Sequence, residues 1–239
     1  MRSDTSDAAP REHAGLFLTL EGPEGAGKTT QGGLLVDALR KAGRTVLRLR
    51  EPGGTEVGER IRSLLLDPRH GELSPRTEML LFAASRAQLV AEVIRPALAA
   101  GAVVVCDRYV DASLAYQGVG RGLGIDVVRT VNEVGTGGLL PDLTLLLDID
   151  PAVGLRRARQ ASAGTGRADG WDGGDRLERE TVAFHDRVRE GFLALAVNEP
   201  RRIRVVDARG SVDDVHRAIW YVVDGLLRSA QGPERRDRS

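Results

Sequence analysis

The amino-acid sequence predicts an α/β fold in which a five-stranded parallel sheet carries helices on both faces. Five short runs rich in apolar, β-branched residues alternate along the chain with longer segments that show helical periodicity. The short runs are apolar throughout, which is typical of parallel strands that are covered on both faces. The predicted strands are residues 16–20, 45–49, 103–106, 143–148 and 203–206.

Between the strands, apolar residues recur with the period of an α-helix. Pro75 and Pro151 lie near the starts of two of these segments, where the first turn of a helix tolerates proline. The predicted helices are residues 28–42, 56–66, 76–99, 125–134, 151–160, 176–197 and 212–227.

Three stretches lack apolar periodicity and are predicted to lie outside the packed part of a single domain at 15–230. Residues 1–14 and 231–239 are rich in charged residues and are predicted to be disordered tails. The internal stretch 161–174 contains five glycines and lies between two predicted helices. Long structureless segments inside a domain often act as lids, so we expect a lid at about residues 160–175. A solvated flexible linker is the alternative.

The composition excludes several classes of protein. With 41% hydrophobic and 28% charged residues, the chain of 239 residues is globular rather than disordered or fibrous. Charged residues interrupt every long apolar stretch, so no membrane-spanning helix is predicted, and residues 1–13 lack the apolar region of a secretory signal. The 34 basic and 34 acidic residues balance, which argues against general binding to nucleic acid or a membrane surface but leaves a small anionic ligand open.

Cysteine and histidine usage narrows the chemistry further. The single cysteine, Cys106, lies in an apolar run and is predicted to be a buried thiol, which favours a cytoplasmic location. The four histidines are scattered without metal-ligand spacing, so no zinc site is predicted. No Gly-x-Ser-x-Gly pattern occurs, so acyl transfer has no support.

Residues 22–29 read Gly-Pro-Glu-Gly-Ala-Gly-Lys-Thr and match the phosphate-binding pattern G-x-x-x-x-G-K-[ST] between a predicted strand and a predicted helix. Glycines let backbone N–H groups converge on phosphate oxygens, and the helix N-terminus adds its positive end. We therefore predict a P-loop NTPase fold, a glycine-rich turn without ligand being the alternative. The predicted ATP-binding residues of this loop are Gly22, Pro23, Glu24, Gly25, Ala26, Gly27, Lys28, Thr29 and Thr30.

Lys28 is predicted to be catalytic and to bridge the β- and γ-phosphates. It is one of only two lysines, with Lys41, among 34 basic residues, and a compact ammonium fits where a planar guanidinium would not. The Thr29 hydroxyl is expected to ligate Mg²⁺. Asp107, at the end of the third strand, is a second candidate for the magnesium site, although it could instead cap the element that follows.

A P-loop indicates nucleotide binding but not the reaction, which depends on other motifs. The chain contains Arg-Glu-Pro-Gly-Gly-Thr at 50–55, Leu-Phe-Ala-Ala-Ser-Arg at 81–86, Asp-Arg-Tyr at 107–109 and Asp-Arg-Leu-Glu at 175–178. With Ser113, Tyr116 and Gln117, these motifs closely resemble bacterial thymidylate kinases, from about residue 16 to about residue 227. The resemblance implies a nucleoside monophosphate kinase type of fold with a lid. It also implies transfer of the γ-phosphoryl group of ATP to dTMP with Mg²⁺, a step in dTTP synthesis, and a homodimer packed through helices beside the acceptor site.

The resemblance also assigns an acceptor site. Phe82 would stack on the thymine ring, while Arg86 and Gln117 would pair along its O4 edge. Arg62 and Arg108 would hold the acceptor phosphate, and Arg108 is counted as catalytic. The full predicted site is Glu24, Glu51, Pro52, Arg62, Phe82, Arg86, Arg108, Ser113, Tyr116 and Gln117.

Simpler interpretations of these residues stay open on the sequence alone. Phe82 lies among leucines and could be a core residue, and Tyr116 could simply pack. Arg62 and Arg86 could be solvated charges on helices.

The resemblance further implies an arginine that stabilises the transferred phosphoryl group, supplied by the P-loop or by the lid. Residues 24–26, Glu-Gly-Ala, offer no basic side chain, so we expect the lid to supply it. Arg167 is the first candidate and Arg159 the second, whereas Arg157 and Arg176 are expected to clamp ATP or to tie the lid down. Arg50 is the next candidate if none of these acts.

Two other functions are kept as alternatives. Another nucleotide or deoxynucleoside kinase would share the P-loop and lid and differ in its acceptor motifs. A P-loop switch or assembly factor would hydrolyse ATP without an acceptor, and it would have no use for a base pocket.

Overall fold

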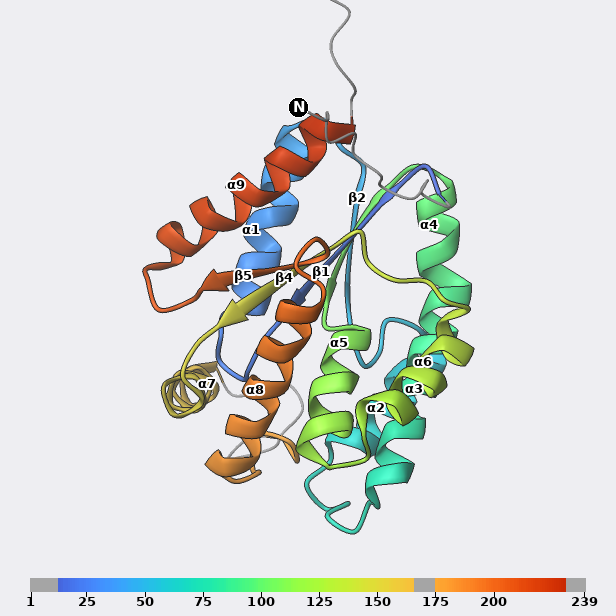
Figure 1. The fold of residues 1–239 in the computed structure, drawn as a ribbon, viewed down its shortest axis with the longest axis vertical. Helices are drawn as coiled ribbons and strands as arrows, with labels where there is room; N and C mark the ends of the chain where they lie inside the picture. The colour runs from blue at the N-terminus through green and yellow to red at the C-terminus, as the bar shows by residue number, and fades with distance from the viewer. Residues whose placement is uncertain (1–12, 166–174, 231–239) are drawn as a thin grey trace, which may run out of the picture.

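The computed structural model describes residues 13–165 and 175–230, which contain a five-stranded sheet in the order β2-β3-β1-β4-β5 (Figure 1). All four neighbouring pairs of strands are parallel. The strands are β1 (Leu16–Glu21), β2 (Val46–Arg50), β3 (Val103–Asp107), β4 (Leu143–Asp148) and β5 (Ile203–Asp207). The predicted strands are therefore confirmed to within one residue at each end.

The helices connect these strands, and each of the seven predicted helical segments overlaps at least one observed helix. Two segments, η1 and η2, are π-helical. The described elements are α1 (Lys28–Lys41), α2 (Glu56–Leu66), α3 (Pro75–Leu89), η1 (Val90–Ile94), α4 (Arg95–Ala99), α5 (Val110–Ser113), η2 (Leu114–Gly120), α6 (Ile125–Thr136), α7 (Pro151–Thr165), α8 (Val182–Asn198) and α9 (Val212–Ala230).

Three helices differ most from their predicted bounds, and the others agree to within three residues at each end. The predicted helix 76–99 is divided by η1, because Pro96 has no N–H for the carbonyl one turn earlier and its ring crowds that carbonyl. The predicted helix 176–197 begins only at Val182, after Thr181 accepts a hydrogen bond from the N–H of Phe184 (3.2 Å). Helix α7 runs to Thr165, so the first part of the stretch expected as a loop is helical.

The segment containing α5 and η2 was not predicted as a helix. Residues 110–118 are all buried, so the segment has no solvent-exposed face and its apolar residues show no amphipathic period. Residues 1–12 of the predicted tail 1–14, the predicted tail 231–239 and residues 166–174 of the predicted lid lie outside the described residues.

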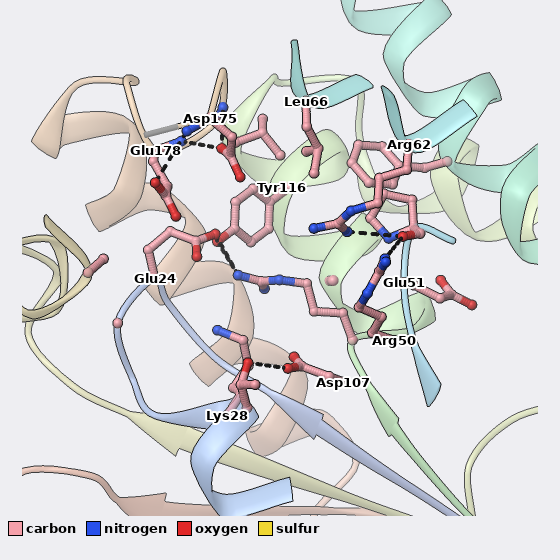
Figure 2. Close-up of a pocket in the computed structure, with 18 of the residues that line it drawn as sticks. Glu24, Lys28, Arg50, Glu51, Arg62, Leu66, Asp107, Tyr116, Asp175 and Glu178 are labelled. Atoms are coloured by element: carbon pink, nitrogen blue, oxygen red, sulfur yellow. Dashed lines mark hydrogen bonds and ion pairs between the residues drawn. The ribbon is translucent and has the colours of Figure 1, made fainter. Parts of the chain in front are cut away.

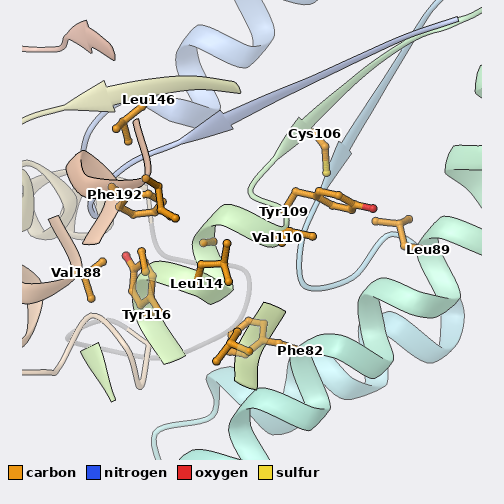
Figure 3. Packing of buried hydrophobic residues seen from close by; sticks show 14 of the residues in the cluster. Phe82, Leu89, Cys106, Tyr109, Val110, Leu114, Tyr116, Leu146, Val188 and Phe192 are labelled. Atoms are coloured by element: carbon orange, nitrogen blue, oxygen red, sulfur yellow. The ribbon is translucent and has the colours of Figure 1, made fainter. Parts of the chain in front are cut away.

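Apolar side chains cover both faces of the sheet. On one face, Leu18 of β1 belongs to a cluster with Leu35 of α1 and Ile219 of α9. On the other face, Phe17 belongs to a cluster with side chains of α3, η2 and α8, part of which is shown in Figure 3. The side chains of adjacent residues of β1 thus point to opposite faces of the sheet, as they do in any pleated strand.

The topology places the functional loops together. Strand β1 lies between β3 and β4, so the connection from β1 to β2 runs to one side of it and the connection from β3 to β4 runs to the other. The carboxyl ends of the parallel strands β1, β2 and β3 meet at one edge. Ligands of open α/β sheets bind at such a switch point. No helix within residues 13–165 or 175–230 is long and apolar enough to span a bilayer.

Candidate active site

A cavity of about 450 Å³ opens at this edge of the sheet, within the size range of small-molecule sites (Figure 2). It brings together most of the residues predicted from sequence, from the P-loop, the strand ends and helices α2, α3 and η2. The predicted residues that line it are Glu24, Gly25, Gly27, Lys28, Thr29, Thr30, Glu51, Pro52, Arg62, Phe82, Arg86, Asp107, Arg108, Ser113, Tyr116, Gln117 and Arg157.

The P-loop depends on glycine at two close approaches. Gly22 and Gly25 have φ of 137° and 67°, in the region that side chains disfavour. A Cβ atom on Gly22 would lie 2.3 Å from the carbonyl oxygen of Leu147, and one on Gly25 would lie 1.9 Å from that of Gly154. The loop therefore packs its backbone directly on β4 and α7. Gly22, Pro23 and Ala26, which were also predicted to bind ATP, do not line the cavity.

Lys28 folds back over the loop that precedes it. Its ammonium donates to the backbone oxygens of Gly22 (3.1 Å) and Pro23 (2.7 Å). Burial and the neighbouring Arg108 lower the pKa of Lys28, although the carboxylate of Glu24 opposes them. The ammonium is thus held at the phosphate loop by two neutral backbone oxygens, which the oxygens of an anionic ligand can replace.

Thr29 and Asp107 meet next to Lys28. The Thr29 hydroxyl donates to Oδ2 of Asp107 over 2.8 Å, which joins the start of α1 to the end of β3 (Figure 2). The alternative role of Asp107 as a cap is wrong, because α5 begins after Tyr109 without a side-chain cap. The pair offers one hydroxyl and one carboxylate, both hard oxygen donors.

Arg108, Glu24 and Tyr116 form a partly buried cluster in the middle of the cavity. Arg108 is the non-glycine residue with positive φ (70°) among those described, and its guanidinium donates to Oε1 of Glu24 (2.6 Å) and to the Tyr116 hydroxyl (3.1 Å). The Tyr116 hydroxyl in turn donates to Glu24 (2.9 Å). Burial alone would raise the pKa of Glu24, but Arg108, Lys28 and Tyr116 together hold it at about 2. Tyr116 also packs edge-on against Phe184, so its ring belongs to the core while its hydroxyl belongs to the site.

Arg86 is fully buried. The alternative interpretation of Arg86 as a solvated charge on a helix is therefore wrong. Its Nε donates to Glu51 (2.7 Å), and its two terminal nitrogens donate to Ser113 (2.9 Å), to Asn132 and to the backbone oxygen of Tyr109 (2.9 Å). All three nitrogens are thus engaged within the protein. Asn132, on α6, is a partner that sequence reasoning missed, because a lone asparagine in a helix carries no pattern.

Phe82 of α3 and Arg62 of α2 both line the cavity. Phe82 is 8% exposed and belongs to the buried cluster, so the core interpretation and the pocket interpretation both hold for it. Arg62 donates to the backbone oxygen of Pro52 (3.0 Å), as does Arg50 from the end of β2 (3.1 Å). Pro52 follows a cis peptide bond with Glu51.

The arginines expected around the lid have different surroundings. Arg157 lines the cavity and donates to the backbone oxygens of Ala208 (3.0 Å) and Arg209 (3.4 Å). Arg159 is exposed and does not line the cavity. Arg176 is buried against α2 and α3, where it donates to the backbone oxygen of Leu65 (2.8 Å), and this position favours tying the chain down over clamping ATP. Arg167 lies outside the described residues.

Several acidic residues of the site received no role from the sequence. Asp175 and Glu178 line the cavity, and Oδ1 of Asp175 accepts from the N–H of Glu178 (2.9 Å) (Figure 2). Their motif was visible in the sequence and was used only to identify the resemblance. Glu21, at the end of β1, accepts from the N–H groups of Tyr109 (2.7 Å) and Ala112 (3.2 Å), and burial and Asp111 raise its pKa to about 8.

Comparison with known proteins agrees with this geometry. The family model described as thymidylate kinase matches residues 20–219. The chain is 53% identical to the thymidylate kinase of Solidesulfovibrio magneticus over 89% of this chain and 100% of that protein. It is 54% identical to the thymidylate kinase of Deinococcus radiodurans, over 87% of this chain and 96% of that one.

A solved structure points the same way. The crystal structure of thymidylate kinase from Ehrlichia chaffeensis superposes with a TM-score of 0.70 at 29% identity, over 87% of this chain and 98% of that chain. The present chain belongs to the thymidylate kinase family.

Proposed function

We propose that this chain transfers the γ-phosphoryl group of ATP to dTMP, forming dTDP and ADP. The observation that carries the proposal is that one cavity is lined both by the P-loop and by the predicted acceptor residues Phe82, Arg108 and Gln117. Phosphoryl transfer needs in-line positioning and neutralisation of charge, with little covalent chemistry by the protein. A cavity lined by both groups of residues supports such positioning. The reaction is a step towards dTTP.

On the donor side, Lys28 contacts the β- and γ-phosphates after exchanging its two backbone partners for phosphate oxygens. The backbone N–H groups at the start of α1 bind the same phosphates, because their helix dipole is positive there. Arg157 lies beside the backbone of residues 208–209, and this position supports its role at the other end of ATP.

On the acceptor side, Arg62 and Arg108 hold the dTMP phosphate by charge-assisted hydrogen bonds. The cluster with Glu24 and Tyr116 fixes the orientation of Arg108, and Phe82 stacks on the base. Ser113 and Glu51 act through Arg86, whose three nitrogens they help to occupy. The direct contact of Arg86 with the base O4 stays a prediction.

Thr29 and Asp107 would hold Mg²⁺ next to the phosphates. Within residues 13–165 and 175–230, no cluster of three or more histidine, cysteine or acidic side chains forms a metal site of its own. Magnesium at phosphoryl-transfer sites takes one or two protein oxygens and completes its shell with phosphates and water, so this pair suffices. When bound, the ion would neutralise charge on the phosphoryl oxygens.

A homodimer is part of the proposal and rests on exposed apolar side chains of α3 and α6. These helices pack closely, since a Cβ on Gly135 would lie 3.3 Å from the carbonyl oxygen of Ala83. Leu80 on α3 and Val127 and Val134 on α6 are 55%, 53% and 83% exposed. Exposed apolar side chains on two helices that pack together suit contact with a second copy of the chain.

Light scattering during gel filtration tests the dimer. Val134→Glu should give a monomer, whereas Val197→Glu, at a position on α8 that is 78% exposed, should leave the dimer intact. A monomeric wild-type protein at micromolar concentration would contradict this part of the proposal. The predicted cytoplasmic location stays a prediction.

An acceptor assay tests the function itself. Purified protein with ATP and Mg²⁺ is offered dTMP, dUMP, dCMP and dGMP in turn, and ADP release is measured. We expect dTMP to be the preferred acceptor. Preference for another monophosphate would indicate a different nucleotide kinase, and ATP hydrolysis at the same rate without acceptor would indicate a switch or assembly factor.

A further inference from the structure

Glu78 is a buried carboxylate behind the acceptor site, and the proposed mechanism does not use it. It lies in the first turn of α3, where it is fully buried. Phe82 and Arg86 follow it at intervals of four residues, so the three side chains share one face of the helix. Glu78 therefore continues the wall that Phe82 and Arg86 form.

Three side chains from later in the chain converge on this carboxylate. Gln117 of η2 donates from Nε2 to Oε1 of Glu78 over 2.9 Å. Arg121 donates from Nε (3.2 Å) and from a terminal nitrogen (3.0 Å), and Arg176 forms an ion pair with Oε2 at 2.7 Å. Burial alone would raise the pKa of Glu78, but Arg121, Gln117 and Arg176 outweigh it and lower the pKa, so the group is ionised at neutral pH.

An ionised carboxylate only accepts hydrogen bonds, and this determines which end of the Gln117 amide faces it. The NH₂ group must point to Glu78, so the carbonyl oxygen takes the other side of the amide. Gln117 lines the cavity, and its Oε1 has no hydrogen-bond partner in the part of the chain that the structure describes. The free end of the amide is thus an acceptor.

The base edge of the acceptor nucleotide distinguishes between the two ends of an amide. Thymine and uracil carry a hydrogen on N3 and donate there, whereas N3 of cytosine is an acceptor. A carbonyl oxygen in the pocket therefore suits thymine and repels cytosine. A reversed amide would present an N–H group, which suits cytosine instead.

We propose that Glu78 is a specificity-determining positioning residue, which holds the Gln117 amide with its carbonyl oxygen towards the base and so selects a base that donates from N3. The inference rests on the proposed function, because it requires Gln117 to contact the acceptor base. Arg121 and Arg176 keep the carboxylate charged and in place. Arg121 is itself held by an ion pair with Glu180 (2.5 Å) and lies over the ring of Phe184.

The test is Glu78→Gln, compared with Glu180→Gln as the matched control. A glutamine at 78 can both donate and accept, so it no longer dictates the orientation of Gln117. Glu180→Gln removes the same charge from the same arginine but touches Gln117 in no described contact. The readout is kcat/KM for dTMP divided by kcat/KM for dCMP, together with the KM for ATP.

We expect Glu78→Gln to lower this ratio by about 10-fold or more, mainly through a higher KM for dTMP, with the KM for ATP little changed. Glu180→Gln should keep the ratio within about threefold of wild type. Gln117→Leu should lower the ratio as Glu78→Gln does, and the double variant should lower it no further. If Glu78→Gln does not fold, Glu78→Asp keeps the charge for both arginines but shortens the reach to Gln117, with the same expected direction.

Two results would overturn the inference. In the first, the foldable variants at 78 keep the wild-type ratio while Gln117→Leu loses it. In the second, Glu180→Gln lowers the ratio as much as Glu78→Gln, so that the arginines rather than the amide are responsible. Failure of the proposed function would look different, because the wild-type protein itself would then show no preference for dTMP.

Discussion

Replacing Lys28 by alanine removes the one lysine of the P-loop. In the structure its ammonium holds the backbone oxygens of Gly22 and Pro23 and is buried beside the phosphate-binding N-terminus of α1. Loss of one such donor to developing charge typically costs about 2.7–4 kcal/mol in the transition state, so turnover should fall about 100- to 1000-fold. The effect should be on kcat, because the contact strengthens as charge moves on the transferred group.

The fold should survive this change. The backbone oxygen of Gly22 keeps a second donor, Arg108, at 3.1 Å, so only the 2.7 Å bond to Pro23 is left without a replacement. One such bond from a charged donor contributes about 1.5–3 kcal/mol. At about 2–4 °C per kcal/mol for a domain of this size, that corresponds to a fall in Tm of about 3–12 °C.

The assay couples ADP release to a spectrophotometric readout at saturating ATP and dTMP, with Tm measured on the same samples. Lys41→Ala is the matched control, because Lys41 is the other lysine of the chain and is exposed at the end of α1. Near-normal kcat in folded Lys28→Ala would refute the role in transfer. A normal kcat with a raised KM for ATP would mean that Lys28 binds ATP equally in the ground state and the transition state.

The remaining predictions concern the acceptor, the arginines and pH. We expect dTMP to be preferred to dUMP by only about 10- to 200-fold, because one methyl group in an apolar pocket discriminates weakly, and equal rates for dTMP and dCMP would contradict the proposed base site. Four arginines are changed to alanine one at a time: Arg157, Arg159, Arg167 and Arg176. At least one of these variants should have a turnover lowered by about 100-fold with the KM for ATP little changed, and wild-type rates in all four folded variants would refute a lid arginine. The pKa of Glu24 is about 2 when folded and 4.5 ordinarily, so its contribution to stability is complete above pH 4.5 and is lost as the pH falls through 2. Urea unfolding of Glu24→Gln should therefore depend less on pH across this range than that of the wild type, and equal slopes would count against the Arg108 pairing.

Much of the fold was predictable because its signals are local. A parallel strand buried on both faces is an apolar run of five or six residues, and β1, β3 and β4 are all of this kind. The P-loop is predictable for the same reason, since eight consecutive residues contain both its glycines and its lysine. The acceptor residues were predictable only through the resemblance, because no period or spacing connects Phe82 with Gln117.

What the sequence by itself determined is therefore the succession of strands and helices along the chain and the phosphate loop, whereas the acceptor residues were identified through the resemblance. Tertiary structure alone decided where each buried charge finds its partner. Arg176 pairs with Glu78, which lies 98 residues earlier, and Arg86 reaches Asn132, 46 residues later. A charged side chain in the core requires a hydrogen-bonding or oppositely charged partner, and the packing of the helices decides which residue that partner is. The sequence does not show how far along the chain, or on which side, the partner lies. Residues 110–118 show the same limit in the backbone, since a helix buried on every side has no amphipathic pattern to read.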